Sequence, residues 1–159
     1  MSNADRLFTF LMVDDDPDDR MLFKEACEEV RLRNPVEFLE NGEQLVDYLN
    51  RKGPYAALAD QPLPGIILLD LNMPLKDGRE ALEEIKATAS LRHIPIIVLT
   101  TSKNEDDILS SYGLGASSYI VKPVSLDRLM RVVNSIGEYW VQIVEVPDGS
   151  LALELPDID

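Results

Sequence analysis

The chain has little cysteine, little histidine and no long apolar run. Its single cysteine, Cys27, cannot form an internal disulfide and lies among apolar residues at helical spacing, which is typical of a buried structural thiol. The single histidine, His93, has no second histidine or cysteine near it, so a zinc-type site is not indicated. No segment approaches the roughly 20 apolar residues of a membrane span, and the start lacks a signal peptide's apolar core. We therefore expect a cytoplasmic protein that does not enter a membrane.

Basic residues are also scarce, with 15 Lys and Arg against 29 Asp and Glu and a net charge of -14. This balance disfavours nucleic acid and anionic membranes as partners, because both are polyanions. It is compatible with a basic protein partner or a bound cation. The 159 residues suit one domain with a substantial core. We expect a flexible N-terminus over 1–6, a folded domain with a C-terminal extension over 7–146, and an acidic tail over 147–159.

The sequence is organised around a run of four aliphatic residues, 66–69, that ends at Asp70. Such a run predicts a short strand buried on both faces. Similar strands are predicted at 7–13, 36–38, 94–99 and 118–121.

Helices are predicted between these strands from apolar residues at i, i+3 and i+4 spacing. Asp16 before Pro17, Asn41 before Gly42, Asp77 and Ser125 are the expected caps, and another helix begins near Asn104. Residues 53–65 are expected to form a loop, and the alternation over 141–146 indicates an extended segment. Five strands alternating with five helices predict an α/β fold with a doubly wound parallel sheet.

The predicted strands end in side chains that suit one kind of chemistry: Asp14 and Asp15, then Asp70, Thr100 and Lys122. The carboxyl ends of parallel strands lie on one edge of the sheet, where open α/β sheets bind ligands. Clustered carboxylates resist ionisation unless a cation lies among them, and Mg²⁺ favours carboxylate, phosphate and water oxygens. Aspartate can also attack phosphorus to give an acyl phosphate. Each residue alone has an ordinary structural explanation, but together they indicate phosphoryl chemistry.

The sequence resembles the receiver domains of bacterial two-component response regulators over about residues 7–137. The resemblance rests on the pair Asp14-Asp15, on Leu69-Asp70-Leu71-Asn72-Met73-Pro74, on Val98-Leu99-Thr100-Thr101 and on Val121-Lys122-Pro123. It implies a flavodoxin-like sheet with strand order 2-1-3-4-5.

The resemblance also implies roles for the residues of the site. Asp70 would be the phosphoacceptor, and Asp15 and the Asn72 carbonyl would join it on Mg²⁺, with Asp14 holding the ion through water. Lys122 would pair with the phosphoryl group.

Thr100 would turn to hydrogen-bond the phosphoryl group, and Tyr119 would be the aromatic switch that follows Thr100. Ordinary packing at the sheet edge is the alternative for Tyr119.

Several surface and loop segments also resemble the single-domain regulators that are paired with phytochrome-type histidine kinases. These segments are 75–80, the Pro-rich loop before residue 66, 101–107 and 135–140. A sensor histidine kinase of this type is therefore the expected partner.

After Gly137 about twenty residues remain, too few for an output domain, so output is expected to run through protein contacts. One hypothesis is a homodimer formed by the last two helices and the C-terminal extension, with Tyr139, Trp140, Val141 and Ile143 in its interface. The alternative is that the extension folds back on its own domain.

We expect a signalling protein whose only catalysis is its own phosphorylation and dephosphorylation. A phosphate sink or relay is an alternative that the sequence leaves open. A Mg²⁺-dependent phosphohydrolase is disfavoured, because such enzymes need a general acid two residues after the nucleophile, where this chain has the amide of Asn72.

Overall fold

The computed structural model describes residues 8–73, 78–101, 113, 115–122 and 124–143, the last seven by their backbone alone. They contain a five-stranded sheet in the order β2-β1-β3-β4-β5, and every neighbouring pair is parallel. This confirms the predicted topology. The strands are β1 (Phe10–Val13), β2 (Val36–Leu39), β3 (Ile66–Asp70), β4 (Ile96–Thr100) and β5 (Ser118–Val121).

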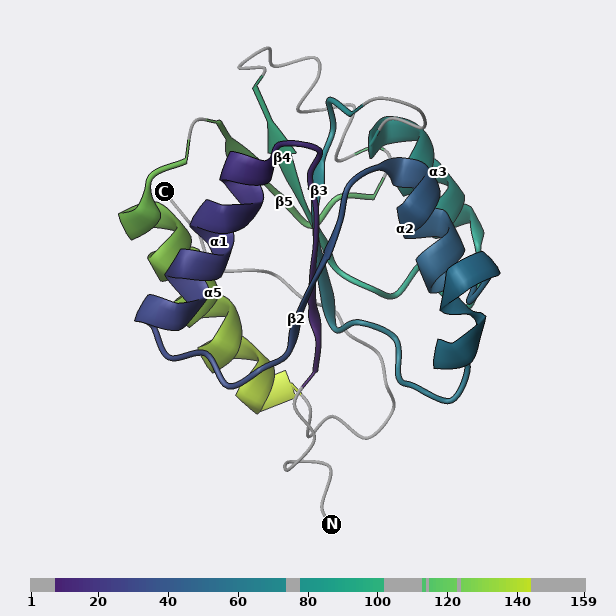
Figure 1. Cartoon of the computed structure of the whole chain (residues 1–159), viewed down its shortest axis with the longest axis horizontal. Coiled ribbons are helices and arrows are strands. Elements are labelled where there is room, and N and C mark those ends of the chain that lie inside the picture. Colours follow the sequence, from purple (N-terminus) through teal and green to yellow (C-terminus); the bar gives the residue numbers. More distant parts are fainter. Residues whose placement is uncertain (1–7, 74–77, 102–112, 114, 123, 144–159) are drawn as a thin grey trace.

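Helices cover both faces of this sheet (Figure 1). α1 (Pro17–Glu29) and α5 (Leu126–Ile143) lie on one face, and α2 (Gly42–Leu49) and α3 (Gly78–Ala87) lie on the other. Four of the five predicted helices are therefore found in the described part of the chain. The helix predicted from about Asn104 and the predicted cap Asp77 lie outside the described residues.

The near-continuous apolar strands follow from this three-layer arrangement, because alternate side chains enter two different cores. In β1, Leu11 and Val13 pack with residues of α2 and α3, whereas Phe10 and Met12 pack with α1 and α5. β1, β3 and β4 are buried at every position. Cys27 belongs to the core on the α1 side, and burial raises the pKa of its thiol to about 12, as expected for a structural cysteine.

The predicted helix caps inside the described residues are confirmed. The Asp16 carboxylate accepts a hydrogen bond from the Asp18 amide, and Asn41 accepts one from Gln44. Ser125 Oγ accepts a bond from the Arg128 amide at 3.1 Å. Each cap satisfies an amide that has no partner inside its helix, and so fixes where the helix begins.

Three predicted boundaries were wrong. Residues 141–143 continue α5 instead of forming an extended segment, because each residue added to an established helix gains a hydrogen bond without a new nucleation cost. The sequence predicts that the first helix ends at Asn34-Pro35, but α1 ends at Glu29, and Arg31 just beyond it takes a left-handed backbone with φ 56°. The predicted loop 53–65 begins with a 3-10 helix, Gly53–Leu58, that has a proline in its first turn.

In the part of the chain that the structure describes, no helix has the length and apolar character to cross a membrane.

Candidate functional site

Three strands bring their terminal side chains together at the carboxyl edge of the sheet. Asp14 follows β1, Asp70 ends β3 and Lys122 follows β5. The Lys122 ammonium lies 2.8 Å from Asp14 Oδ2 and 3.2 Å from Asp70 Oδ2. Residues more than fifty positions apart in the sequence thus form one charged cluster, as the strand-end pattern predicted.

Asp15 completes a trio of acids with Asp14 and Asp70. Carboxylate oxygens from the three residues lie within 4.8 Å of one another. Asp14 and Asp70 are buried, whereas Asp15 is exposed to solvent. The trio offers only oxygen ligands and one open side, which suits a hard divalent cation such as Mg²⁺ or Mn²⁺ and does not suit zinc.

Burial sets the protonation of the two inner acids. It raises the pKa of Asp14 to about 7, although hydrogen bonds from Lys122 and the Asp16 amide oppose the shift. Burial also raises the pKa of Asp70, against the Asn72 amide and the charge of Lys122. Burial opposes the charge of Lys122 itself, but hydrogen bonds to Asp14 and Asp19 outweigh that effect and raise its pKa. The lysine therefore stays charged, while carboxylates remain in excess around it.

Backbone groups hold both inner acids in a single orientation. Asp14 Oδ1 accepts a bond from the Asp16 amide at 2.9 Å, and Asp70 Oδ1 accepts one from the Asn72 amide at 3.0 Å. Each acid thus has one oxygen bound to the backbone and the other directed at Lys122. Arg20 supports the loop after β1 by donating to the Asp14 carbonyl at 2.6 Å.

The remaining predicted site residues lie at the same edge or next to it. Thr100 ends β4 and is buried. Asn72 is exposed, and its side-chain amide donates to Thr101 Oγ1 at 3.2 Å. Tyr119 lies in β5 beside Val98 and packs partly against the core on the α2 and α3 side. The roles of Asn72 as a metal ligand and of Thr100 and Tyr119 in switching stay predictions.

The structure adds one residue that the sequence interpretation missed. Asp19, in the first turn of α1, was not among the predicted site residues, yet its Oδ2 lies 2.7 Å from Lys122 Nζ. Helical side chains tilt toward the N-terminus, and the cap at Asp16 places that end of α1 at the carboxyl edge of the sheet. The cap position was therefore the sequence signal that could have identified Asp19.

The predicted interface residues Tyr139, Trp140, Val141 and Ile143 fall on the last turns of α5. Their side chains lie outside the described residues, so the dimer hypothesis and its alternative both stay open. The exposed His93 follows α3, away from the strand ends that carry the acids.

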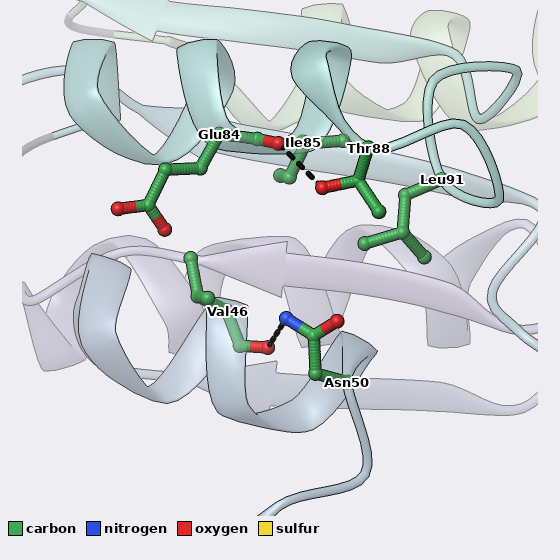
Figure 2. A pocket seen from close by; sticks show the side chains of 6 residues that line it. All are labelled: Val46, Asn50, Glu84, Ile85, Thr88 and Leu91. Atoms are coloured by element: carbon green, nitrogen blue, oxygen red, sulfur yellow. Dashed lines mark hydrogen bonds between the residues drawn. The ribbon is translucent and has the colours of Figure 1, made fainter.

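A small hollow, of about 30 Å³, lies between α2 and α3 (Figure 2). Val46 and Asn50 face Glu84, Ile85 and Thr88 across it. Its volume is close to that of one or two water molecules. Asn50 donates to the Val46 carbonyl and Thr88 donates to the Glu84 carbonyl, so both side chains already bind their own helix. The hollow is a packing feature and does not compete with the acidic site.

Gly78 holds the backbone behind Asp70, and we predict that replacing it by alanine destabilises the protein. An added Cβ would lie 2.3 Å from the Asp70 carbonyl oxygen and 2.6 Å from Leu71 Cα. Because these are backbone atoms at the end of a buried strand, they cannot move aside easily. We expect Gly78→Ala to lower the free energy of unfolding by about 2 kcal/mol in urea titrations.

Gly113→Ala is the matched control, because a Cβ there would meet nothing within 4 Å. It should change the free energy of unfolding by less than about 0.5 kcal/mol. Equal stabilities for the two variants would contradict the close approach at Gly78.

The fold and the site together define the class of protein. It is a doubly wound α/β protein that presents buried aspartates and a charged lysine at one sheet edge, a set of groups suited to a cation and a phosphoryl group. The profile of the response regulator receiver domain matches residues 10–134, and the chain belongs to this family.

Known proteins resemble the chain over most of its length. Response regulator Rcp1 of Synechocystis sp. is 39% identical over 137 residues, which cover 86% of this chain and 91% of Rcp1. The phosphorylated cyanobacterial phytochrome response regulator RcpA superposes with a TM-score of 0.76 at 38% identity, covering 90% of this chain and 100% of that one. The Mn²⁺-bound form of Rcp1 gives a TM-score of 0.73 at 38% identity, covering 88% of this chain and 99% of that one.

Proposed function

We propose that the chain acts as a single-domain response regulator that accepts a phosphoryl group on Asp70, with Mg²⁺, from a partner histidine kinase of the phytochrome type. The observation that carries the proposal is the position of Lys122, whose ammonium contacts both buried acids of the trio. The similarity to RcpA and Rcp1, one phosphorylated and one bound to Mn²⁺, supports both the phosphoryl group and the cation.

The residues of the site divide the chemistry between them. A carboxylate oxygen of Asp70 attacks phosphorus, forming an O–P bond as the bond between phosphorus and the donor's leaving group breaks. The electron pair of the broken bond leaves with the donor. Lys122 offsets negative charge on the transferred group. Asp14, Asp15 and Asp70 would hold Mg²⁺, which when bound would neutralise charge on the phosphoryl oxygens.

The chemistry at Asn72 separates this proposal from a phosphohydrolase. The position two residues after Asp70 carries an amide, which cannot serve as a general acid, and its side chain donates to Thr101. Regulated protein contacts are the proposed output. A phosphate sink or relay uses the same site chemistry, and the fate of the phosphoryl group after transfer would separate it from an output regulator.

For the homodimer, the support is the continuation of α5 to Ile143, which places the predicted interface residues on one helix. Sedimentation with and without a phosphoryl mimic tests it. A concentration-dependent dimer would support the proposal, and a monomer at high concentration under both conditions would exclude it.

The proposed function is tested by incubating the protein with acetyl phosphate and following its intact mass. We expect a single phosphoryl adduct that requires Mg²⁺, disappears with a chelator and maps to the peptide containing Asp70. An adduct that forms equally well without Mg²⁺, or that maps to a peptide without Asp70, would contradict the proposal. Transfer from a phytochrome-type kinase, compared with an unrelated histidine kinase, tests the partner.

Binding of Mg²⁺ is expected to weaken as the pH falls, because Asp14 has a pKa of about 7 in the metal-free protein. Below that pH a proton occupies the carboxyl and must leave when the cation binds. The apparent dissociation constant should rise by up to about tenfold for each pH unit below 7 and level off above it. Calorimetric titration at several pH values measures this slope.

The same raised pKa determines how the stability of the metal-free protein changes with pH. Between the pKa of Asp14 in the unfolded chain and its higher pKa in the folded protein, the folded protein binds more protons. The contribution of this group to stability therefore falls as the pH rises from about 4 toward 7.

Asp14→Asn should lose the proton-linked slope of Mg²⁺ binding, whereas Asp18→Asn, on the exposed first turn of α1, should keep it. A dissociation constant that is independent of pH in the wild type would refute the assignment.

A further inference from the structure

Lys122 has a third carboxylate partner that lies outside the acid trio. Its Nζ is 2.7 Å from Asp19 Oδ2, compared with 2.8 Å from Asp14 and 3.2 Å from Asp70. An ammonium group has three N–H donors, and three carboxylates are arranged around this one. The contact with Asp70, the proposed phosphoacceptor, is the longest of the three.

The surroundings strengthen the pair between Asp19 and Lys122. The Lys122 side chain is 13% exposed and that of Asp19 is 33% exposed. Both residues line a small hollow between α1 and the strand ends, whose walls include Met12, Leu22 and Leu99. Apolar walls reduce screening by water, so this ion pair is stronger than one on an open surface.

We infer that Asp19 is a positioning residue that holds the Lys122 ammonium on the α1 side of the site and so limits how readily Asp70 is phosphorylated. The inference rests on the proposed function. When a donor phosphate approaches Asp70, its oxygens must attract the same ammonium that Asp19 already binds.

The transfer step itself is unchanged by this inference. Asp70 forms the new O–P bond, the donor's bond to phosphorus breaks, and acetate leaves when acetyl phosphate is the donor. Asp19 touches neither phosphorus nor the donor, and acts only through the position of Lys122.

The alternative is that Asp19 serves α1 alone, as an acid at the positive end of the helix dipole. Asp18 is the matched control for that role. It lies beside Asp19 in the same first turn, has the same charge and is exposed. Any effect of helix dipole or of net charge should therefore be shared by Asp18→Asn and Asp19→Asn.

The test compares the rate of phosphorylation by acetyl phosphate with Mg²⁺, followed by intact mass, in the wild type, Asp19→Asn, Asp19→Glu and Asp18→Asn. We expect Asp19→Asn to react roughly fivefold faster than the wild type, since it loses one charge-assisted bond to Lys122. Asp18→Asn should match the wild type. Asp19→Glu keeps the charge and should restore most of the restraint, which a purely structural role of the side chain would not produce.

A second measurement examines the contact without any phosphate. The ε-methylene resonance of Lys122 in the metal-free protein should shift in Asp19→Asn and stay in place in Asp18→Asn. An unshifted resonance in Asp19→Asn would overturn the inference.

Failures of the two proposals can be told apart. A wild type that is phosphorylated while Asp19→Asn reacts at the same rate or more slowly overturns this inference alone. A wild type that forms no adduct overturns the proposed function and this inference with it.

Discussion

Replacing Asp70 with asparagine is expected to abolish the phosphoryl adduct while leaving the protein folded. The asparagine amide has nearly the same shape as the carboxylate but is not a nucleophile toward phosphorus, so the rate should fall by at least about a hundredfold. Intact mass after incubation with acetyl phosphate and Mg²⁺ measures this loss.

Retention of the fold follows from two opposing effects at this position. Burial raises the pKa of Asp70, so removing its charge relieves a cost of the folded state. Against this, asparagine has one side-chain oxygen where aspartate has two, so Lys122 or the Asn72 amide loses an acceptor. The free energy of unfolding should change by only about 1 kcal/mol.

Asp60→Asn is a suitable control, because Asp60 is exposed and lies outside the acid trio. It makes the same chemical change and should be phosphorylated like the wild type. An adduct that persists in Asp70→Asn at the wild-type rate would place the phosphoacceptor elsewhere.

The sequence was sufficient to predict the sheet because each strand carries two independent signals. A short apolar run indicates a strand buried on both faces, and the polar residue after it marks the edge at which the strand ends. Asp70 after Leu69 and Lys122 after Val121 are examples, and both lie where the parallel topology requires. The convergence of Asp14, Asp70 and Lys122 then follows from topology and needs no knowledge of side-chain packing.

Contacts that depend on side-chain direction were harder to predict from the sequence. Lys122 could reach any acid near the edge, and nothing in the spacing of Asp19 distinguishes it from Asp18 until the cap at Asp16 is fixed. The close approach of Gly78 to the Asp70 carbonyl was equally hard to predict from the sequence. Glycine is common in turns, so a turn before α3 explains Gly78 as well as the tertiary contact does.

The end of α5 shows the limit of periodicity over short segments. Residues 141–146, in which Gln142 and Glu145 interrupt apolar residues, were interpreted as an extended segment, but apolar residues at 136, 139, 140 and 143 also fit helical spacing. Gly137 lies inside this helix, although glycine costs about 1 kcal/mol at an interior helix position. α5 continues through it, because extending an established helix adds a hydrogen bond per residue and needs no new nucleation step.

Replacing Lys122 with alanine should separate cation binding from phosphorylation. The variant keeps Asp14, Asp15 and Asp70, so it keeps the oxygens that would hold Mg²⁺. Without the ammonium, the buried acids lose the charge that opposes their raised pKa, and one of them should bind a proton at neutral pH. That proton allows the variant to fold, and the cation can displace it.

The rate of phosphorylation should nevertheless fall by roughly a hundredfold in Lys122→Ala. The variant lacks the preorganised positive group that stabilises the negative charge developing on the transferred phosphoryl group. Lys86→Met is the control, since Lys86 is also a partly buried lysine but donates to the Arg92 and Ile94 carbonyls at 2.9 and 3.0 Å. It should lose some stability and keep the wild-type rate. Calorimetry with Mg²⁺ measures cation binding, and intact mass with acetyl phosphate measures phosphorylation; both are made on the same samples.

Equal losses of Mg²⁺ binding and phosphorylation in Lys122→Ala would mean that the lysine only maintains the pocket. Retained Mg²⁺ binding without the adduct would instead locate its role at the phosphoryl group, which is inferred to compete with Asp19 for the Lys122 ammonium.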